Sequence, residues 1–96
     1  MKIGQIVKER YEILEILGEG GMAFVYKARD TQLERFVAIK TLKPNYVNQE
    51  TFVDRFKREA KTAANLNHPN IVQIFDWGIE GEPYFVMEYI EGNTLT

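Results

Sequence analysis

Three features of the sequence could together handle a phosphate group: a glycine cluster, a lysine that ends an apolar segment, and a glutamate inside a helical stripe. The glycine cluster, Gly18-Glu19-Gly20-Gly21-Met22-Ala23, has the form G-x-G-x-x-A and is called the glycine turn below. Glycine allows the backbone to approach a phosphate closely and leaves amide N–H groups directed at it. An ordinary hairpin turn would show the same pattern, so the residues around the turn decide between the two.

The sequence after the glycine turn separates three kinds of glycine loop. A dinucleotide-binding loop opens a helix and is followed about 20 residues later by an acidic residue. Here the alternating segment Phe24–Arg29 predicts a strand, and the residue 20 positions after Gly18 is Ala38. A Walker loop requires G-K-[ST], which the chain lacks. A hairpin folded over phosphates and a plain glycine hairpin remain as readings of the turn, with a Rossmann-type nucleotide binder as a weaker alternative.

The lysine is Lys40, which closes the apolar segment Val37-Ala38-Ile39-Lys40. Side chains alternate across a strand, so Lys40 is expected on the same face as the small Ala38 and opposite to Val37 and Ile39. That arrangement leaves room for the lysine beneath the glycine turn. A solvated lysine at a strand end is the alternative.

The glutamate is Glu59, which falls inside the apolar stripe predicted for a long helix (Phe52, Phe56, Ala60 and Ala63). Charged residues are rarely buried without a partner, and Lys40 on the neighbouring sheet is the best candidate. Two unit charges about 4 Å apart at an effective dielectric constant of about 20 attract by about 4 kcal/mol before desolvation. A residue at the edge of the stripe that reaches solvent beside the neighbouring arginines is the alternative.

The elements that must position these residues follow from the periodicity of the chain. We expect an α+β fold, with a five-stranded antiparallel sheet and one long helix. The strands are predicted at Tyr11–Gly18, Phe24–Arg29, Phe36–Leu42, Ile71–Trp77 and Pro83–Tyr89, with a hairpin turn over Gly78–Glu82 and the helix from about Gln49 to Leu66. Thr51 and Asp54 resemble a capping box at the start of the helix.

Composition excludes several classes of protein. The chain of 96 residues fits one small domain, and its net charge of −2 gives no reason to expect a nucleic-acid partner. It has no cysteine, so a disulfide framework and a thiolate zinc site are both impossible. The longest apolar run, Met22 to Tyr26, is far too short for a membrane span or signal peptide, which makes a cytoplasmic setting the default.

Taken together, these motifs resemble the N-terminal lobe of eukaryotic-type protein kinases, and most closely the bacterial serine/threonine kinases. The glycine turn with Val25 resembles the kinase glycine-rich loop, Val37–Lys40 the β3 lysine motif, and Glu59 the glutamate of the αC helix. The segments 67–72 and 86–92 are similar to the αC–β4 connection and to the β5 strand that enters the hinge. The resemblance implies an N-terminal extension over 1–10, the ATP-binding lobe over 11–90 and the exit of the hinge over 91–96.

The resemblance also implies roles for single residues. Amides of Gly20, Gly21, Met22 and Ala23 would cover the β- and γ-phosphates, while Lys40, held by Glu59, would bind the α- and β-phosphates. The remaining roles would be divided as follows: Leu17, Val25 and Ala38 above the adenine, Met87 as gatekeeper, the Glu88 carbonyl and the Ile90 amide on the adenine edge, and Ala63 and Ile74 in the hydrophobic spine. Gly18 and Glu19 belong to the same loop.

The chain departs from the family pattern in two ways. Ala23 stands where the family has a third glycine, and the catalytic loop, the magnesium-binding motif and the activation segment are absent from the 96 residues. The resemblance therefore implies ATP and protein substrates, but Mg²⁺ only through a C-terminal lobe, and the chain alone is not expected to catalyse. A pseudokinase or regulatory docking module is the non-enzymatic alternative. Pairing of two copies through this lobe and a membrane anchor further along the parent protein are left open.

Four other groups of residues carry simpler expectations. His68, which precedes a proline, is expected to form local hydrogen bonds. The aromatic residues Phe75, Trp77 and Tyr84 are expected to pack in the core and sheet. The basic residues Arg55, Lys57, Arg58 and Lys61 are expected to form a solvated face of the helix.

Overall fold

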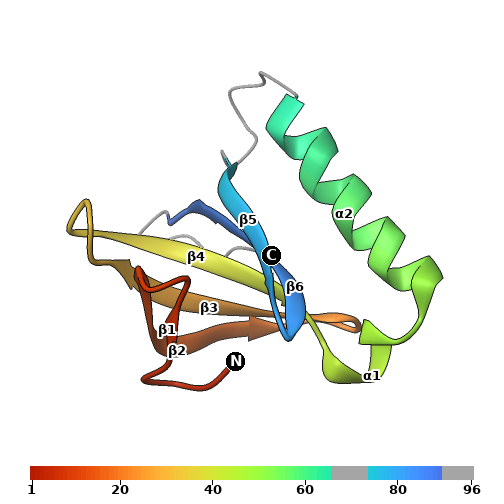
Figure 1. Cartoon of the computed structure of the whole chain (residues 1–96), viewed down its shortest axis with the longest axis horizontal. Coiled ribbons are helices and arrows are strands. Elements are labelled where there is room, and N and C mark those ends of the chain that lie inside the picture. The colour runs from red at the N-terminus through yellow and green to blue at the C-terminus, as the bar shows by residue number, and fades with distance from the viewer. Residues whose placement is uncertain (66–73, 90–96) are drawn as a thin grey trace.

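The computed structural model describes residues 1–65 and 74–89, and within them the side chains of all residues except 59–65 and 80. Figure 1 shows a curled sheet with one long helix beside it. The elements in chain order are β1 (Ile6–Val7), β2 (Tyr11–Glu19), β3 (Ala23–Asp30), β4 (Arg35–Leu42), α1 (Pro44–Val47), α2 (Glu50–Asn65), β5 (Ile74–Glu80) and β6 (Glu82–Glu88). Within this part of the chain, no helix combines the length and the apolar character that crossing a membrane requires.

The strands form one antiparallel sheet in the order β1-β2-β3-β4-β6-β5. This confirms the predicted α+β fold with an antiparallel sheet and one long helix. The predicted number of strands was wrong, because the described residues form six strands and not five. The additional strand, β1, is only two residues long, and no periodic pattern can reveal so short an element.

The β5–β6 connection also differs from the prediction. β5 continues to Glu80, and the turn is reduced to Gly81, whose φ of 79° favours glycine. Gly78, which we expected in the turn, lies within the strand and pairs with Tyr84. A Cβ atom at Gly78 would lie 2.7 Å from the Tyr84 hydroxyl oxygen, so this glycine makes room for a ring.

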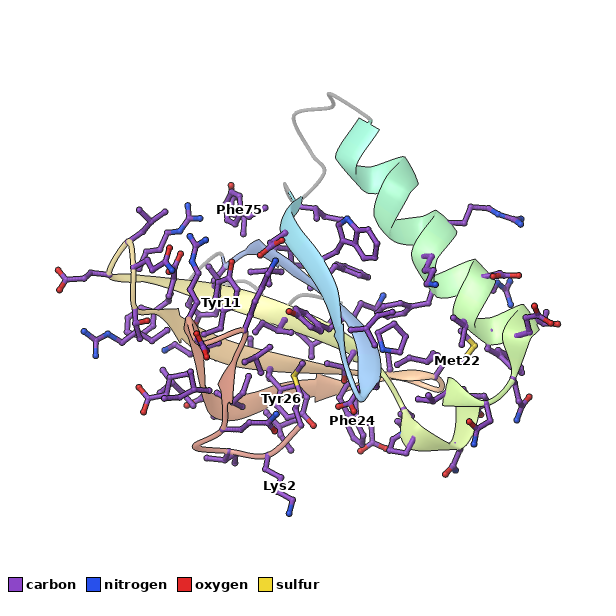
Figure 2. The ribbon with its side chains drawn as sticks, in the orientation of Figure 1. Lys2, Tyr11, Met22, Phe24, Tyr26 and Phe75 are labelled. Carbon is purple, nitrogen blue, oxygen red and sulfur yellow. The ribbon has the colours of Figure 1, made fainter. Side chains whose placement is uncertain are left out.

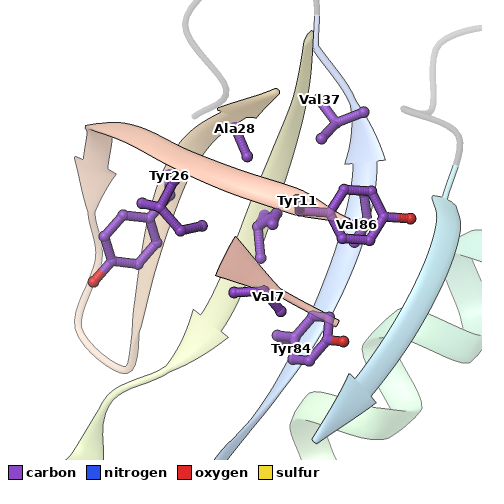
Figure 3. Packing of buried hydrophobic residues seen from close by; sticks show 9 residues of the cluster. Val7, Tyr11, Tyr26, Ala28, Val37, Tyr84 and Val86 are labelled. Carbon is purple, nitrogen blue, oxygen red and sulfur yellow. The ribbon is translucent and has the colours of Figure 1, made fainter. Parts of the chain in front are cut away.

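Alternation along the strands gives the sheet two faces, and each face has its own core. The face covered by residues 1–10 is called the N-terminal face, and Figure 3 shows its buried cluster. The opposite face, against which α2 packs, is called the helix face. The N-terminal face buries Val7, Tyr11, Ile13, Tyr26, Ala28, Val37, Ile39, Tyr84 and Val86, and the helix face buries Ala23, Ala38, Leu42, Phe56, Phe85 and Met87.

Residues 1–10 are tied to both ends of the curled sheet. β1 pairs with β2, while the Lys8 ammonium lies 2.9 Å from an Asp76 oxygen on β5. The Met1 amine lies 2.6 Å from Glu82 Oε1 at the start of β6. Because β1 and β5 are the two edge strands, these contacts close the sheet upon the core of the N-terminal face.

A buried carboxylate fixes the turn between β3 and β4. Asp30 is fully buried and accepts two hydrogen bonds of 2.8 Å from the Arg10 guanidinium. It also accepts bonds from the backbone N–H groups of Gln32 and Leu33, and from Arg35 Nε at 3.3 Å. The hydrogen bonds from Arg10 are the main reason that the pKa of Asp30 lies far below its ordinary value, although burial acts in the opposite direction.

The long helix is anchored to the sheet by one aromatic pair. Phe56 is 3% exposed, and its ring centroid lies 5.0 Å from that of Phe85 on β6. Phe52, half-buried, packs instead on Tyr46 of α1, with 4.7 Å between the ring centroids. The predicted helical stripe is thus confirmed at Phe56, but Phe52 contacts α1. Ala60 and Ala63 lie in α2, and their side chains are outside the described residues.

Candidate nucleotide-binding site

The glycine turn joins β2 to β3 as a hairpin. Gly18 pairs with Val25 and Glu19 with Phe24, and the Gly20 N–H donates to the Ala23 carbonyl oxygen over 2.8 Å. A strand, not a helix, therefore follows the glycines, as predicted. A dinucleotide-binding loop requires a helix at this position, so the Rossmann alternative does not fit the turn.

The fold itself does not require glycine at Gly18, Gly20 or Gly21. None of the three has a left-handed φ, in contrast to Gly81. A Cβ atom would meet nothing within 4 Å at Gly18 or Gly21, and at Gly20 only the Ala23 carbonyl oxygen at 3.8 Å. Neither backbone conformation nor packing explains these glycines, in contrast to Gly78 and Gly81. A bare backbone surface next to open space is what the close approach of a ligand requires.

A row of paired residues crosses the helix face below the glycine turn. Gly18 pairs with Val25, Val25 with Lys40, and Lys40 with Phe85. Since directly paired residues share a face, the lysine lies one strand away from the turn-bearing hairpin and one strand away from the aromatic anchor of α2. The predicted division of β4 is confirmed, because Val37 and Ile39 lie in the core of the N-terminal face and Ala38 in that of the helix face.

A second row runs beside the first and is more apolar. Ala38 pairs with Met87, and Met87 with Ile74 on β5. Ala38 is fully buried and Met87 is 9% exposed, so these two side chains form a closed apolar patch. Lys27, which pairs with Ala38, places its ammonium 4.4 Å from the Phe36 ring centroid and 5.1 Å from that of Tyr89. The helix face thus combines an apolar patch with two lysines.

The remaining predicted site residues are placed as follows. Leu17 is 36% exposed beside the turn, and Met22 is half-buried against the core of the helix face. Glu88 ends β6, whereas Ile90 lies outside the described residues. Glu59 lies in α2, three residues after Phe56, and its side chain is outside the described residues. Residues three apart on a helix share a side, so the backbone of α2 places Glu59 on the side that carries Phe56.

The simpler expectations about aromatic and basic residues are confirmed in part. Tyr84 is buried and Phe75 half-buried against the same core, but Trp77 is 60% exposed, so core packing was wrong for Trp77. Trp77 pairs with Phe85 at the edge strand β5, where only one neighbouring strand can cover it.

The basic residues that the structure describes, Arg55, Lys57 and Arg58, are exposed on α2 as predicted. Lys61 (its side chain) and His68 lie outside the described residues.

Two residues near the glycine turn were missed from the sequence. Phe85 was assigned only to a strand, although it is the contact between Lys40 and the helix. Lys43 follows β4, and its backbone N–H donates to the Met22 carbonyl oxygen over 2.7 Å. Neither role has a local pattern, because both depend on contacts between distant segments. Within residues 1–65 and 74–89, histidine, cysteine, aspartate and glutamate form no group of three or more suited to a metal ion.

Known proteins resemble this chain in sequence. The sequence model of the protein kinase domain matches residues 11–96. The chain belongs to the protein kinase family. Its kinase relatives include the probable serine/threonine-protein kinase of Clostridium perfringens, 54% identical over 97% of this chain, and the serine/threonine-protein kinase PrkC of Bacillus subtilis, 53% identical over 99%.

Solved structures agree with the fold. The structure titled PpkA-294 apo form has a TM-score of 0.82 and 30% identity, and it matches 99% of this chain. The PknI kinase domain of Mycobacterium tuberculosis has a TM-score of 0.75 and 30% identity over 94% of this chain. The chain covers 40% and 36% of those two structures, and only 14% and 15% of the two relatives named above. It therefore corresponds to the N-terminal part of a kinase.

Proposed function

We propose that this chain is the ATP-holding N-terminal lobe of a protein serine/threonine kinase. In the parent protein, with a C-terminal lobe present, it would take part in the transfer of the γ-phosphoryl group of ATP to protein hydroxyl groups. The names of the relatives support the serine/threonine specificity, since each named relative is described as a serine/threonine-protein kinase. The chain alone is not expected to catalyse, because the 96 residues do not contain the catalytic-loop motif that carries the family's catalytic aspartate.

The row from Gly18 through Val25 and Lys40 to Phe85 carries the proposal. It aligns a bare glycine turn, a cation and the anchor of α2 on one face of the sheet. Kinases catalyse phosphoryl transfer chiefly by positioning the phosphates and neutralising their charge, and these are the functions that such a row can supply.

The residues of this chain would divide the work in space. Amides of Gly20 to Ala23 would cover the β- and γ-phosphates, and Lys40 would bind the α- and β-phosphates. Leu17, Val25 and Ala38 would lie above the adenine ring, with Met87 behind it as gatekeeper. The Glu88 carbonyl and the Ile90 amide would hydrogen-bond the adenine edge. Excluding water from this apolar slot would strengthen the attraction between Lys40 and the phosphates.

Glu59 would orient the lysine. An ammonium held by a carboxylate on α2 presents its charge in one direction, whereas a solitary lysine has about 2 kcal/mol of rotamer entropy to lose. The position of α2 then matters, and the packing of Phe56 on Phe85, with Val53 beside it, helps to set that position. Breaking a buried pair of this kind is more costly than its net contribution to stability, so its value lies in orientation.

The other partners follow from the family and belong to the proposal. Mg²⁺ would be held by residues of the C-terminal lobe and would neutralise charge on the phosphates, and no residue of this chain is assigned to it. Protein substrates would also dock mainly on that lobe. We place this segment in the cytoplasm, where ATP is available. Without cysteine the chain has no disulfide that would require an oxidising compartment. Pairing of two copies through this lobe and a membrane anchor in the parent protein stay predictions.

Replacement of Lys40 by methionine in the parent kinase tests the proposal. Methionine keeps the unbranched apolar stem of lysine but removes the charge, so the fold should persist. We expect turnover to fall at least 100-fold, which corresponds to about 3 kcal/mol of lost transition-state stabilisation. The measurement is phosphate transfer from labelled ATP, together with the thermal unfolding midpoint of each variant.

Lys2→Met is the matched control, because Lys2 is an exposed lysine among residues 1–10, which cover the face opposite to the helix face. Its turnover should equal that of the wild type. Turnover of Lys40→Met close to the wild-type rate, with intact folding, would reject the assigned role. A wild-type parent protein that binds ATP without turnover would favour the non-catalytic docking module.

A further inference from the structure

Lys43 contacts both arms of the glycine turn. Its backbone N–H donates to the Met22 carbonyl oxygen at 2.7 Å, next to the tip. Its ammonium lies 2.8 Å from Glu19 Oε2 on the β2 arm and 5.0 Å from the ring centroid of Phe24 on the β3 arm. One residue just after β4 thus holds the last residue of β2, the tip, and the start of β3. Figure 2 labels Met22 at the end of the β2–β3 hairpin beside α1, and Phe24 further from α1 on the same hairpin.

The ammonium acts from the side opposite to the proposed nucleotide. Glu19 pairs with Phe24, whereas the adjacent pair on the hairpin is Gly18 with Val25. Successive residues of a strand point to opposite faces, so Glu19 and Phe24 belong to the N-terminal face. Phe24 indeed packs against the core of that face. Lys43 can therefore influence a phosphate only through the conformation of the turn.

The tip of the turn has few other restraints. Gly20 and Gly21 are exposed and have no side chains, and within the turn the Gly20 N–H donates a hydrogen bond to the Ala23 carbonyl oxygen. Glycine loses more conformational freedom on ordering than any other residue, so fixing two glycines around a phosphate is costly. A contact that holds both arms before the ligand arrives lowers this cost at the moment of binding.

We propose that Lys43, through Glu19, is a positioning residue that holds the glycine turn in its phosphate-binding conformation. This inference rests on the proposed nucleotide site. The side chain of Lys43 is 17% exposed and that of Glu19 is 61% exposed, so solvent weakens the ion pair on one side. Partly exposed pairs of this kind change an equilibrium about two- to fivefold. The ion pair between Lys43 and Glu19, called the latch below, therefore has a modest effect on binding, and salt weakens it.

Four variants of the parent kinase test the latch: Glu19→Gln, Lys43→Met, the double variant with both changes, and the charge-swapped Glu19→Lys/Lys43→Glu. Binding of mant-ATP with Mg²⁺ is measured at low and high salt. We expect each single variant to bind about two- to fivefold more weakly at low salt. The double variant should lose no more than either single variant, because the interaction is lost only once. The swapped pair should recover most of the affinity, and the differences should shrink at high salt.

Hydrogen exchange of the turn in the nucleotide-free protein gives a second measurement that does not depend on ATP. Amides of residues 18–24 should exchange about two- to fivefold faster in Glu19→Gln, since local opening follows the lost contact. Exchange in the β5–β6 hairpin should be unchanged. Single variants that bind and exchange like the wild type, or a swapped pair no better than the singles, would overturn the latch.

The two proposals fail in different ways. A wild-type parent kinase that does not bind mant-ATP would reject the nucleotide site, and the latch with it. Tight binding by the wild type that Lys40→Met weakens, with Glu19 and Lys43 variants unchanged, would reject the latch alone. Lys43→Arg is the conservative variant, and it should retain wild-type affinity because the pair is kept.

Discussion

Replacement of Asp30 by asparagine, which exchanges one carboxylate oxygen for an NH₂ group, is expected to destabilise the lobe strongly. Asp30 is fully buried and accepts bonds from Arg10, Arg35, and two backbone N–H groups of the β3–β4 turn. Asparagine keeps the shape, and its oxygen can still accept the backbone bonds. Its NH₂ group, however, would point a second donor at the guanidinium groups.

The magnitude follows from what is left behind. Removing one partner of a buried ion pair typically costs about 3–5 kcal/mol, because the remaining charge stays desolvated. The side chain of Arg10 is 23% exposed, so water relieves part of that penalty. We therefore expect about 3 kcal/mol, a large share of the roughly 5–15 kcal/mol that stabilises a domain.

The assay is chemical denaturation followed by circular dichroism, repeated from neutral to acidic pH. In the wild type, the folded-state pKa of Asp30 lies below the ordinary value of 3.8, so its contribution is present above that value. This stability is lost as the pH falls below about 4, since the unfolded state then binds the proton more readily. The asparagine variant lacks this group and should lose less stability over the same pH range.

Glu15→Gln, at an exposed position of β2, is the control for removing one carboxylate charge. It should change the free energy of unfolding by less than about 0.5 kcal/mol. A loss below about 1 kcal/mol for Asp30→Asn, or an acid response equal to that of the wild type, would refute the reasoning. The buried network would then contribute no more than an ordinary hydrogen bond.

Two further predictions concern the sheet and the helix. Phe56→Ala removes the ring that packs 5.0 Å from Phe85 and should cost about 3–5 kcal/mol; denaturation measures it, and Phe52→Ala, at a half-buried position, should cost less. A cost for Phe56→Ala below that of Phe52→Ala would contradict the anchoring role. Gly78→Ala would bring a Cβ atom to 2.7 Å from the Tyr84 hydroxyl and should cost about 1–3 kcal/mol, whereas Gly21→Ala meets nothing within 4 Å and should leave the unfolding midpoint unchanged. Equal midpoints for the two alanine variants would show that Gly78 does not make room for the ring.

Local patterns predicted the parts of the site that lie within single elements. The alternation around Lys40 predicted the face that carries Ala38, and the apolar spacing predicted the helix with Phe56 on its buried side. The glycine turn was placed correctly because strand alternation resumes immediately after it. Each of these signals extends over only a few residues, so the sequence alone reveals it.

Contacts between distant segments were not predictable in the same way. β1 depends on bonds such as Lys8 to Asp76, which are 68 residues apart, and no pattern near Ile6 announces them. The turn at Gly81 was misplaced because Gly78 looked equally suited to it, and only the Tyr84 ring explains why Gly78 is in the strand. Lys43 was missed for the same reason, since its partner Glu19 lies across the sheet.

The separation of the two cores has a mechanical consequence. The core of the N-terminal face joins β1 to β6 without any residue of α2, whereas α2 enters only the core of the helix face. A sideways shift or rotation of α2 therefore exchanges contacts around Phe56 and Phe85 and leaves the closed side of the sheet intact. The core of the N-terminal face therefore does not depend on the position of α2. Under the proposed function, a shift of α2 would change the distance between Glu59 and Lys40 while the strand that carries the lysine stays in place.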